Sequence, residues 1–234
     1  MRTLLIIIGL ISCIEASGQK TTKQVLYAAT QRFGKVLTYS ADINLTFQIP
    51  GVQLESINGK VYYKKPSKFR IHSKGILFLP KQNPYYALQS IRDTTSFTAV
   101  PSGTELYNGK KNTVISVIPS DGTDDLVLGK FWIEESTQLV HKAQLTTKSN
   151  GTLTIEQRFG TFAGYGLPDE IKFVVDVAKF KIPKVVAMEL NSKSKKASEA
   201  RNKRGSGEIT LRFSNYKINK QLEEKVFEET KAKE

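Results

Sequence analysis

A strict alternation of apolar and polar side chains, with a period of two residues, is the feature that most restricts the fold of this chain. Between residues 40 and 49 each polar residue is followed by an apolar one: Ala41, Ile43, Leu45, Phe47 and Ile49. Successive side chains of an extended strand point to opposite faces, so this period places the apolar side chains on one face. The segment therefore predicts a half-buried β-strand.

The same period returns later in the chain, and turn signals separate the runs. Apolar residues alternate at 171–177 and 209–213, and less regularly at 61–63 and 153–159. Turns are expected at Asn58-Gly59, Asn108-Gly109, Asp121-Gly122, Asn150-Gly151 and 164–168. Repeated strands without intervening helices exclude a parallel α/β architecture. The sequence therefore predicts an antiparallel sheet.

Helical patterns are few. Thr21 and Gln24 have the spacing of a capping box, and apolar residues then recur at helical spacing over 25–33. This pattern predicts one amphipathic helix before the first strand. Short helices are also expected at 84–92 and 220–231. The chain of 234 residues is long enough for a substantial core, and we expect one mainly β (α+β) domain.

The first 18 residues have the pattern of a secretory signal peptide. Arg2 precedes an apolar run over 4–11, which is too short to span a bilayer. Ala16 and Gly18 are the small residues expected before a cleavage site that would leave Gln19 as the mature N-terminus. The sequence therefore predicts a signal peptide over 1–18 and an exported domain over 19–234.

A second ending of the export segment stays open. Leu10-Ile11-Ser12-Cys13 resembles a bacterial lipobox, in which the cysteine is acylated and anchors the protein to a membrane. Both endings predict an exported protein, and no later apolar stretch approaches transmembrane length.

The charge of the chain favours negatively charged partners. It carries 35 Lys and Arg against 22 Asp and Glu, a net charge of +13. Residues 191–207 read as a flexible basic loop, whose six cations are Lys193, Lys195, Lys196, Arg201, Lys203 and Arg204. The loop has no aromatic residue for base stacking, so nucleic acid is disfavoured. A solvated loop and a contact with an anionic membrane or acidic partner both remain open.

Signals for catalysis are weak. The chain has two histidines and one cysteine, which excludes His-rich and multi-cysteine metal sites. The adjacent pair Glu134-Glu135 points to opposite faces of a strand and reads as solvated edge acids. His141 is expected on the same strand face as Ala143 and Leu145, where a hydrogen-bonded core histidine is favoured over a functional one. We expect a protein that is not an enzyme and needs no cofactor or metal.

Four segments, in order, carry a resemblance to a known family. Residues 59–70 read as a strand, a basic break at Pro66, and a second strand that opens on Phe69-Arg70. The later segments are Phe131-Trp132-Ile133, Gly166-Leu167-Pro168 and Phe213-Ser214-Asn215-Tyr216. After a signal peptide and an opening helix, this order resembles the LolA-like outer-membrane lipoprotein carriers. The resemblance spans roughly residues 20 to 229.

The resemblance implies a single curved antiparallel sheet that forms an incomplete barrel, with a few short helices covering its concave apolar face. That face would hold the acyl chains of a lipid or lipoprotein in the periplasm, in a monomer that meets transport partners at the inner and outer membranes. The candidate cavity residues are Ile43, Leu45, Phe47, Tyr63, Trp132, Phe173 and Leu211. Arg70 matches the arginine that ties the lid to the barrel in the carriers, although a plain surface arginine fits its strand position equally well.

The chain departs from the carrier pattern in two places. Residues 73–80 replace the usual Asp-Gly turn and aromatic strand, and the basic loop is additional. Free lipid or glycolipid therefore remains open as the cargo. A fully packed β-sandwich or barrel is the competing fold. The competing function is an envelope module that docks through the basic loop and carries nothing.

Overall fold

The computed structural model describes residues 21–50, 54–73, 97–120, 125–148, 151–176 and 205–228. Several predictions lie outside these ranges: the export segment with Cys13, the helix at 84–92, the turn at 121–122 and the six cations of the basic loop. Within the described ranges no helix is long and apolar enough to cross a membrane.

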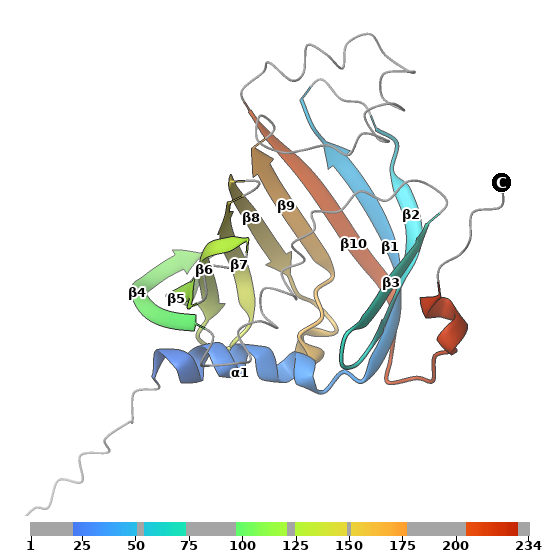
Figure 1. Ribbon diagram of the computed structural model, residues 1–234, viewed down its shortest axis with the longest axis horizontal. Coiled ribbons are helices and arrows are strands. Elements are labelled where there is room, and N and C mark those ends of the chain that lie inside the picture. Colours follow the sequence, from blue (N-terminus) through green and yellow to red (C-terminus); the bar gives the residue numbers. More distant parts are fainter. Residues whose placement is uncertain are drawn as a thin grey trace, which may run out of the picture.

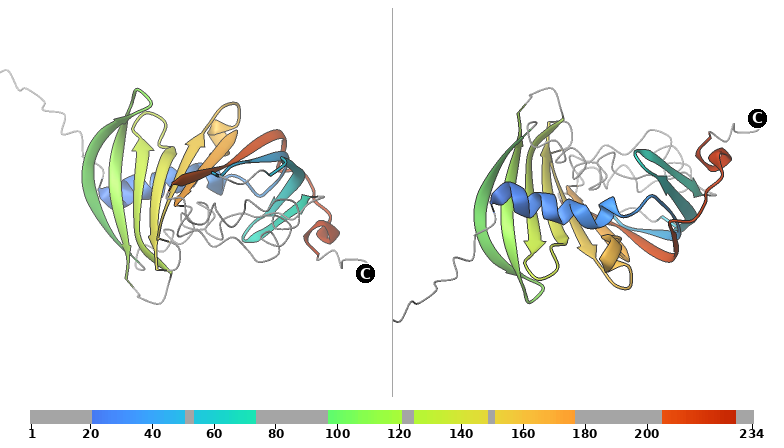
Figure 2. Two further views of the ribbon diagram at one scale, coloured as in Figure 1. Left: turned by 90° about the horizontal axis from the view of Figure 1, so that it is seen from above. Right: turned by 90° about the horizontal axis from the view of Figure 1, so that it is seen from below.

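Ten antiparallel strands form one sheet in the order β3-β2-β1-β10-β9-β8-β7-β6-β5-β4. The strands are β1 Thr38–Gln48, β2 Ile57–Lys64, β3 Lys68–Ser73, β4 Phe97–Tyr107, β5 Lys110–Pro119, β6 Leu126–Glu134, β7 Val140–Thr147, β8 Gly151–Arg158, β9 Glu170–Asp176 and β10 Ser206–Ile218. The sheet is strongly curved, and its edge strands β3 and β4 do not meet (Figure 2). The predicted open, mainly β architecture is confirmed.

The opening helix α1 (Thr22–Gly34) begins at the predicted capping box. The Gln24 backbone N–H donates to Thr21 Oγ1 over 3.3 Å, and the Thr21 N–H donates to Gln24 Oε1 over 2.9 Å. The helix runs across the strands at one end of the sheet (Figure 1). Its buried Leu26 packs into the core cluster on one face of the sheet. We call this face the inner face and the opposite one the outer face.

The strand β1 confirms the alternation of apolar and polar side chains that was predicted over residues 40–49. Ile43 and Leu45 are buried on the inner face, whereas Asp42 and Asn44 point outward and stay half-buried. β1 lies between β2 and β10, so the first strand pairs directly with the last. This pairing places residues far apart in the sequence next to one another on the inner face.

Two sequence expectations about secondary structure need correction. Asn58-Gly59 lies inside β2 and forms no turn. Beyond β10 the expected helix over 220–231 is reduced, in the described residues, to the 3₁₀ turn η2 (Glu224–Phe227). The described ranges contain one α-helix, α1, and two 3₁₀ turns, η1 (Ala163–Tyr165) and η2.

Candidate functional site

The inner face brings together six of the seven predicted cavity residues. β1 contributes Ile43, Leu45 and Phe47, and Tyr63, Phe173 and Leu211 come from β2, β9 and β10. Leu45 faces Leu211 across the β1–β10 pair, and Ile209 lies between Phe47 and Phe173. Antiparallel pairing therefore aligns apolar side chains from separate strands into one continuous surface.

The larger of two clusters on this face extends from β1 through β10 to β4. Its fully buried members include Leu45, Phe131 and Leu145. Phe47 and Phe213 pack against the cluster but remain half-buried. The inner face therefore combines a buried core with large apolar side chains that keep part of their surface accessible.

The second cluster is aromatic and lies where α1 leads into β1. The Tyr39 and Tyr63 rings stack with centroids 5.4 Å apart, and Phe33 of α1 lies 5.1 Å from Tyr63. Tyr216 contacts Tyr39 and Phe162, at 5.8 and 5.0 Å respectively. Its hydroxyl group also donates to the Pro168 carbonyl over 2.8 Å. These contacts join the helix, the β8–β9 connection and the strands β1, β2 and β10.

A β-bulge explains why Phe213 and Tyr216, three positions apart on one strand, both pack into this cluster. The register between β1 and β10 shifts between Ser40 and Asp42, and Asn215 there has a φ of 53°. The bulge brings Phe213 and Tyr216 onto the same face, with stacked rings 5.9 Å apart. Asn215 Nδ2 donates to Asp42 Oδ2 over 2.8 Å on the other side of the strand pair.

Trp132 is the one cavity candidate that the structure separates from the other six. Its neighbours Phe131 and Ile133 belong to the inner-face core, so Trp132 points to the outer face. There its ring lies under the ammonium groups of Lys130 and Lys142, at 4.7 and 4.8 Å from the ring centroid. These contacts bury the indole without placing it in the apolar core.

Arg70 also lies on the outer face. Its strand neighbours Phe69 and Ile71 pack into the aromatic cluster, as the alternation predicted. The guanidinium Nη2 donates to the Glu228 carbonyl over 3.3 Å. In the described residues Arg70 therefore contacts the C-terminal segment, whereas the carrier resemblance implied a lid contact.

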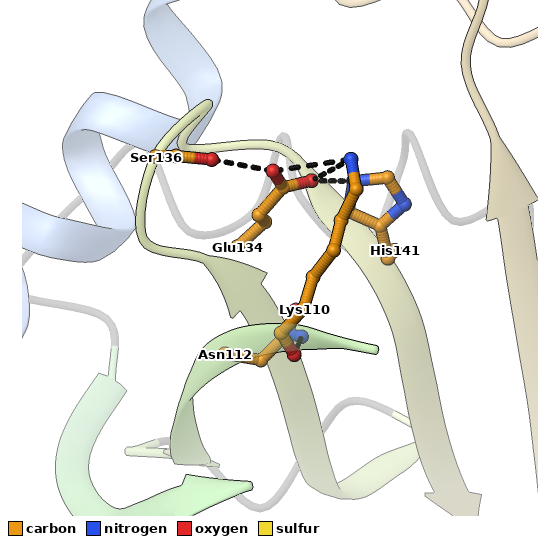
Figure 3. A network of polar contacts seen from close by, with 5 residues as sticks. All are labelled: Lys110, Asn112, Glu134, Ser136 and His141. Atoms are coloured by element: carbon orange, nitrogen blue, oxygen red, sulfur yellow. Dashed lines mark hydrogen bonds and ion pairs between the residues drawn. The ribbon is translucent and has the colours of Figure 1, made fainter. Parts of the chain in front are cut away.

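Glu134 and His141 form a polar network that sequence reasoning missed (Figure 3). The Glu134 carboxylate, with a side chain that is 4% exposed, accepts hydrogen bonds from Ser136 Oγ and from Lys110 Nζ, the latter at 3.0 and 3.2 Å. His141 Nε2 lies 2.7 Å from Glu134 Oε2. Nearby, Asn112 Nδ2 donates to the Lys110 carbonyl over 2.8 Å.

One sequence expectation about this network was wrong. Glu134 is a buried acid, whereas Glu135 is more exposed and pairs with Lys111 over 3.0 Å. The register between β6 and β7 shifts next to Trp132, which pairs Val140 with Ile133 in the core. His141 lies at this register shift, beside Glu134 and with its ring centroid 5.3 Å from that of Phe159. Alternation alone cannot reveal such a bulge.

The pKa values of both network residues are lowered. Burial raises the pKa of Glu134, but hydrogen bonds from Ser136 and Lys110 outweigh burial and lower it overall. Burial lowers the pKa of His141, and the nearby Glu134 opposes this effect only in part. The network therefore favours an ionised Glu134 and a neutral His141 near pH 7. In the described ranges no three His, Cys, Asp or Glu side chains are grouped to hold a metal ion.

Acid is expected to destabilise the protein through this network. The folded pKa of Glu134 lies below the ordinary 4.5, so its contribution is present above pH 4.5 and is lost as the pH falls through the folded value. The folded pKa of His141 lies below 6.5, so the same sign applies at higher pH. We expect the melting temperature of a His141→Gln variant to fall less between pH 7 and pH 5 than that of the native protein. Equal falls would contradict the assignment.

Proteins that resemble this chain are found among solved structures. No family model matches the sequence, and no curated protein matches it. Among solved structures, a LolA superfamily protein from Nitrosomonas europaea aligns with a TM-score of 0.58 and 12% identity, over 90% of this chain and 99% of that one. A domain assigned to outer membrane lipoprotein sorting from Vibrio parahaemolyticus aligns at 0.56 and 10%, over 88% and 97%.

A third solved structure agrees with these two. A DUF1329 family protein from Desulfovibrio piger aligns with a TM-score of 0.54 and 10% identity, over 90% of this chain and 98% of that one. Identities this low show a shared fold only, and they do not indicate that this chain binds the ligands of these proteins. The open curved sheet with α1 across one end is thus a LolA-like fold.

Proposed function

We propose that this protein is an exported carrier that binds the acyl chains of lipids or lipoproteins against the inner face of its sheet and moves them toward the outer membrane. The observation that carries the proposal is the continuous apolar inner face of a sheet that does not close. Phe47 and Phe213 keep accessible apolar surface beside the buried cluster. In a sandwich a second sheet would cover this surface, and in a closed barrel the opposite strands would cover it.

The chemistry of this face suits an acyl chain. Burial of each methylene group contributes about 0.8 kcal/mol, so a chain that lies along several strands gains affinity without any specific polar contact. The accessible apolar surface comes from the half-buried Phe47 and Phe213, and buried apolar side chains lie beneath it: Ile43, Leu45, Tyr63, Phe173 and Leu211. No catalytic step is needed for such a role, and the proposal assigns none.

Location and partners follow from the proposal. Cleavage after residue 18 would release the domain 19–234 into the periplasm, whereas acylation of Cys13 would hold it on a membrane as a fixed receptor. A shuttling carrier needs the first outcome, with a donor at the inner membrane and an acceptor at the outer one. The lipoprotein-sorting name of the Vibrio parahaemolyticus domain supports this direction of transport.

Solvent extraction of the purified native protein, followed by lipid mass spectrometry, tests the proposal. We expect acyl lipid in about stoichiometric amount, because an acyl chain that lies along several strands would dissociate slowly from the inner face. A control protein of similar net charge, purified in the same way, should yield little lipid. Extracts from the two proteins with equal lipid content would contradict the carrier role.

A further inference from the structure

The outer face of the β2–β3 hairpin carries three cations within one small area. Lys64 of β2 lies directly opposite Lys68 of β3, and Arg70 follows two positions along β3, on the same face. Phe69 and Ile71 point to the inner face and pack into the aromatic cluster. The hairpin core therefore holds the three cations at fixed positions on a sheet surface.

The C-terminal segment of the chain, residues 219–228, occupies this basic surface. Glu224 binds both lysines: Oε1 pairs with Lys64, and Oε2 lies 2.6 Å from Lys68 Nζ. The Lys68 ammonium group also lies 5.9 Å from the centroid of the Phe227 ring. Arg70 donates to the backbone carbonyl of Glu228. Figure 1 shows η2, which contains Glu224 and Phe227, beside the hairpin.

The start of this segment is held firmly, but the rest is held weakly. Asn219, with a φ of 54°, accepts the Leu37 N–H at its Oδ1 over 2.8 Å, and Thr38 Oγ1 donates to the Lys220 carbonyl over 2.6 Å. Beyond this point η2 has no buried residue. The side chains of Lys68 and Glu224 are 52% and 55% exposed, so salt screens their ion pair.

We propose that the outer face of the β2–β3 hairpin is a docking surface for an acidic, aromatic-containing peptide segment of a partner protein, and that the chain's own residues 219–228 cover it as an internal competitor. The contacts of the segment define what the surface recognises: a carboxylate between Lys64 and Lys68, and an aromatic ring next to Lys68. The Arg70 contact goes to a peptide carbonyl, which a lipid headgroup does not offer. This proposal does not depend on the carrier role.

The test measures binding of a fluorescent peptide with the sequence of residues 219–228, at low salt, by fluorescence anisotropy. Glu224→Gln removes the carboxylate that binds both lysines and raises the population in which the surface is open. We therefore expect the variant to bind the peptide about threefold to tenfold more tightly than the native protein does. Glu223→Gln is the matched control, because Glu223 is 68% exposed and pairs with Lys225 two positions further along the chain. It should leave binding unchanged.

A second set of variants identifies the surface. Adding Lys64→Gln and Lys68→Gln to the Glu224→Gln protein should abolish the gain, and both lysines are exposed enough to be replaced without disturbing the core. A peptide with glutamine in place of its own Glu224 should bind more weakly. Equal peptide affinities of the native and Glu224→Gln proteins would overturn the proposal. So would a gain in binding that appears with phosphatidylglycerol vesicles but not with the peptide.

Discussion

Replacement of Phe131 with alanine is expected to lower the free energy of unfolding by about 3 to 5 kcal/mol, the usual cost of removing a fully buried aromatic ring. Phe131 is 1% exposed and lies in the central part of the inner-face cluster, between Ile115 of β5 and Ala143 of β7. Its ring also covers Gly129, where an added Cβ would lie 2.8 Å from Phe131 Cε2. The neighbouring strands cannot collapse into the space that the ring leaves, because their backbone pairing fixes their distance.

Denaturant unfolding monitored by circular dichroism would measure this cost. Ile118→Ala is the control, since Ile118 lies on the neighbouring strand β5 but is 46% exposed, and we expect it to cost no more than about 0.5 kcal/mol. The two variants should unfold with similar dependence on denaturant concentration. A cost for Phe131→Ala as small as that for Ile118→Ala would show that the inner-face core is loosely packed at β6.

The parts of the fold that the sequence predicts are those that local patterns determine. The capping box at Thr21 and the alternation along β1 each depend on neighbouring residues, and both are found as expected. Asn58-Gly59 shows where local reasoning fails. A Cβ added to Gly59 would lie 2.5 Å from the His72 carbonyl oxygen on β3, so the glycine serves a close approach between strands. That requirement comes from a strand pair more than ten residues away.

The candidate site likewise contains residues that a local pattern predicts and residues that depend on contacts between distant segments. Ile43, Leu45 and Phe47 follow from the alternation within one strand, and the structure places them together. Phe131-Trp132-Ile133 gives no such signal, because all three residues are buried and the middle one is covered by lysines on the outer face. The aromatic cluster around Tyr216 and the Glu134–His141 network both depend on β-bulges, which shift a register without changing residue types.

The variant Leu45→Gln is expected to reduce uptake of a fluorescent acyl probe by about tenfold, since an acyl chain loses apolar contact and meets an amide. Leu45 lies on the inner face of β1, opposite Leu211, and the partly accessible Phe47 is two positions away on the same face. Because Leu45 is 0% exposed, the glutamine amide can reach water only if the inner face opens enough to admit an acyl chain. The melting temperature should then fall by only a few degrees.

Thr46→Gln is the matched control, because it introduces the same side chain at the adjacent position on the outer face and should change neither measurement much. In a close-packed core the same amide at position 45 would be buried without partners. It would then cost about 1 to 3 kcal/mol in addition to the lost apolar packing. A Leu45→Gln protein that melts many degrees lower but takes up the probe at full affinity would place Leu45 in a closed core. The ligand would then have to bind elsewhere, and the carrier proposal would lose the inner face as its physical basis.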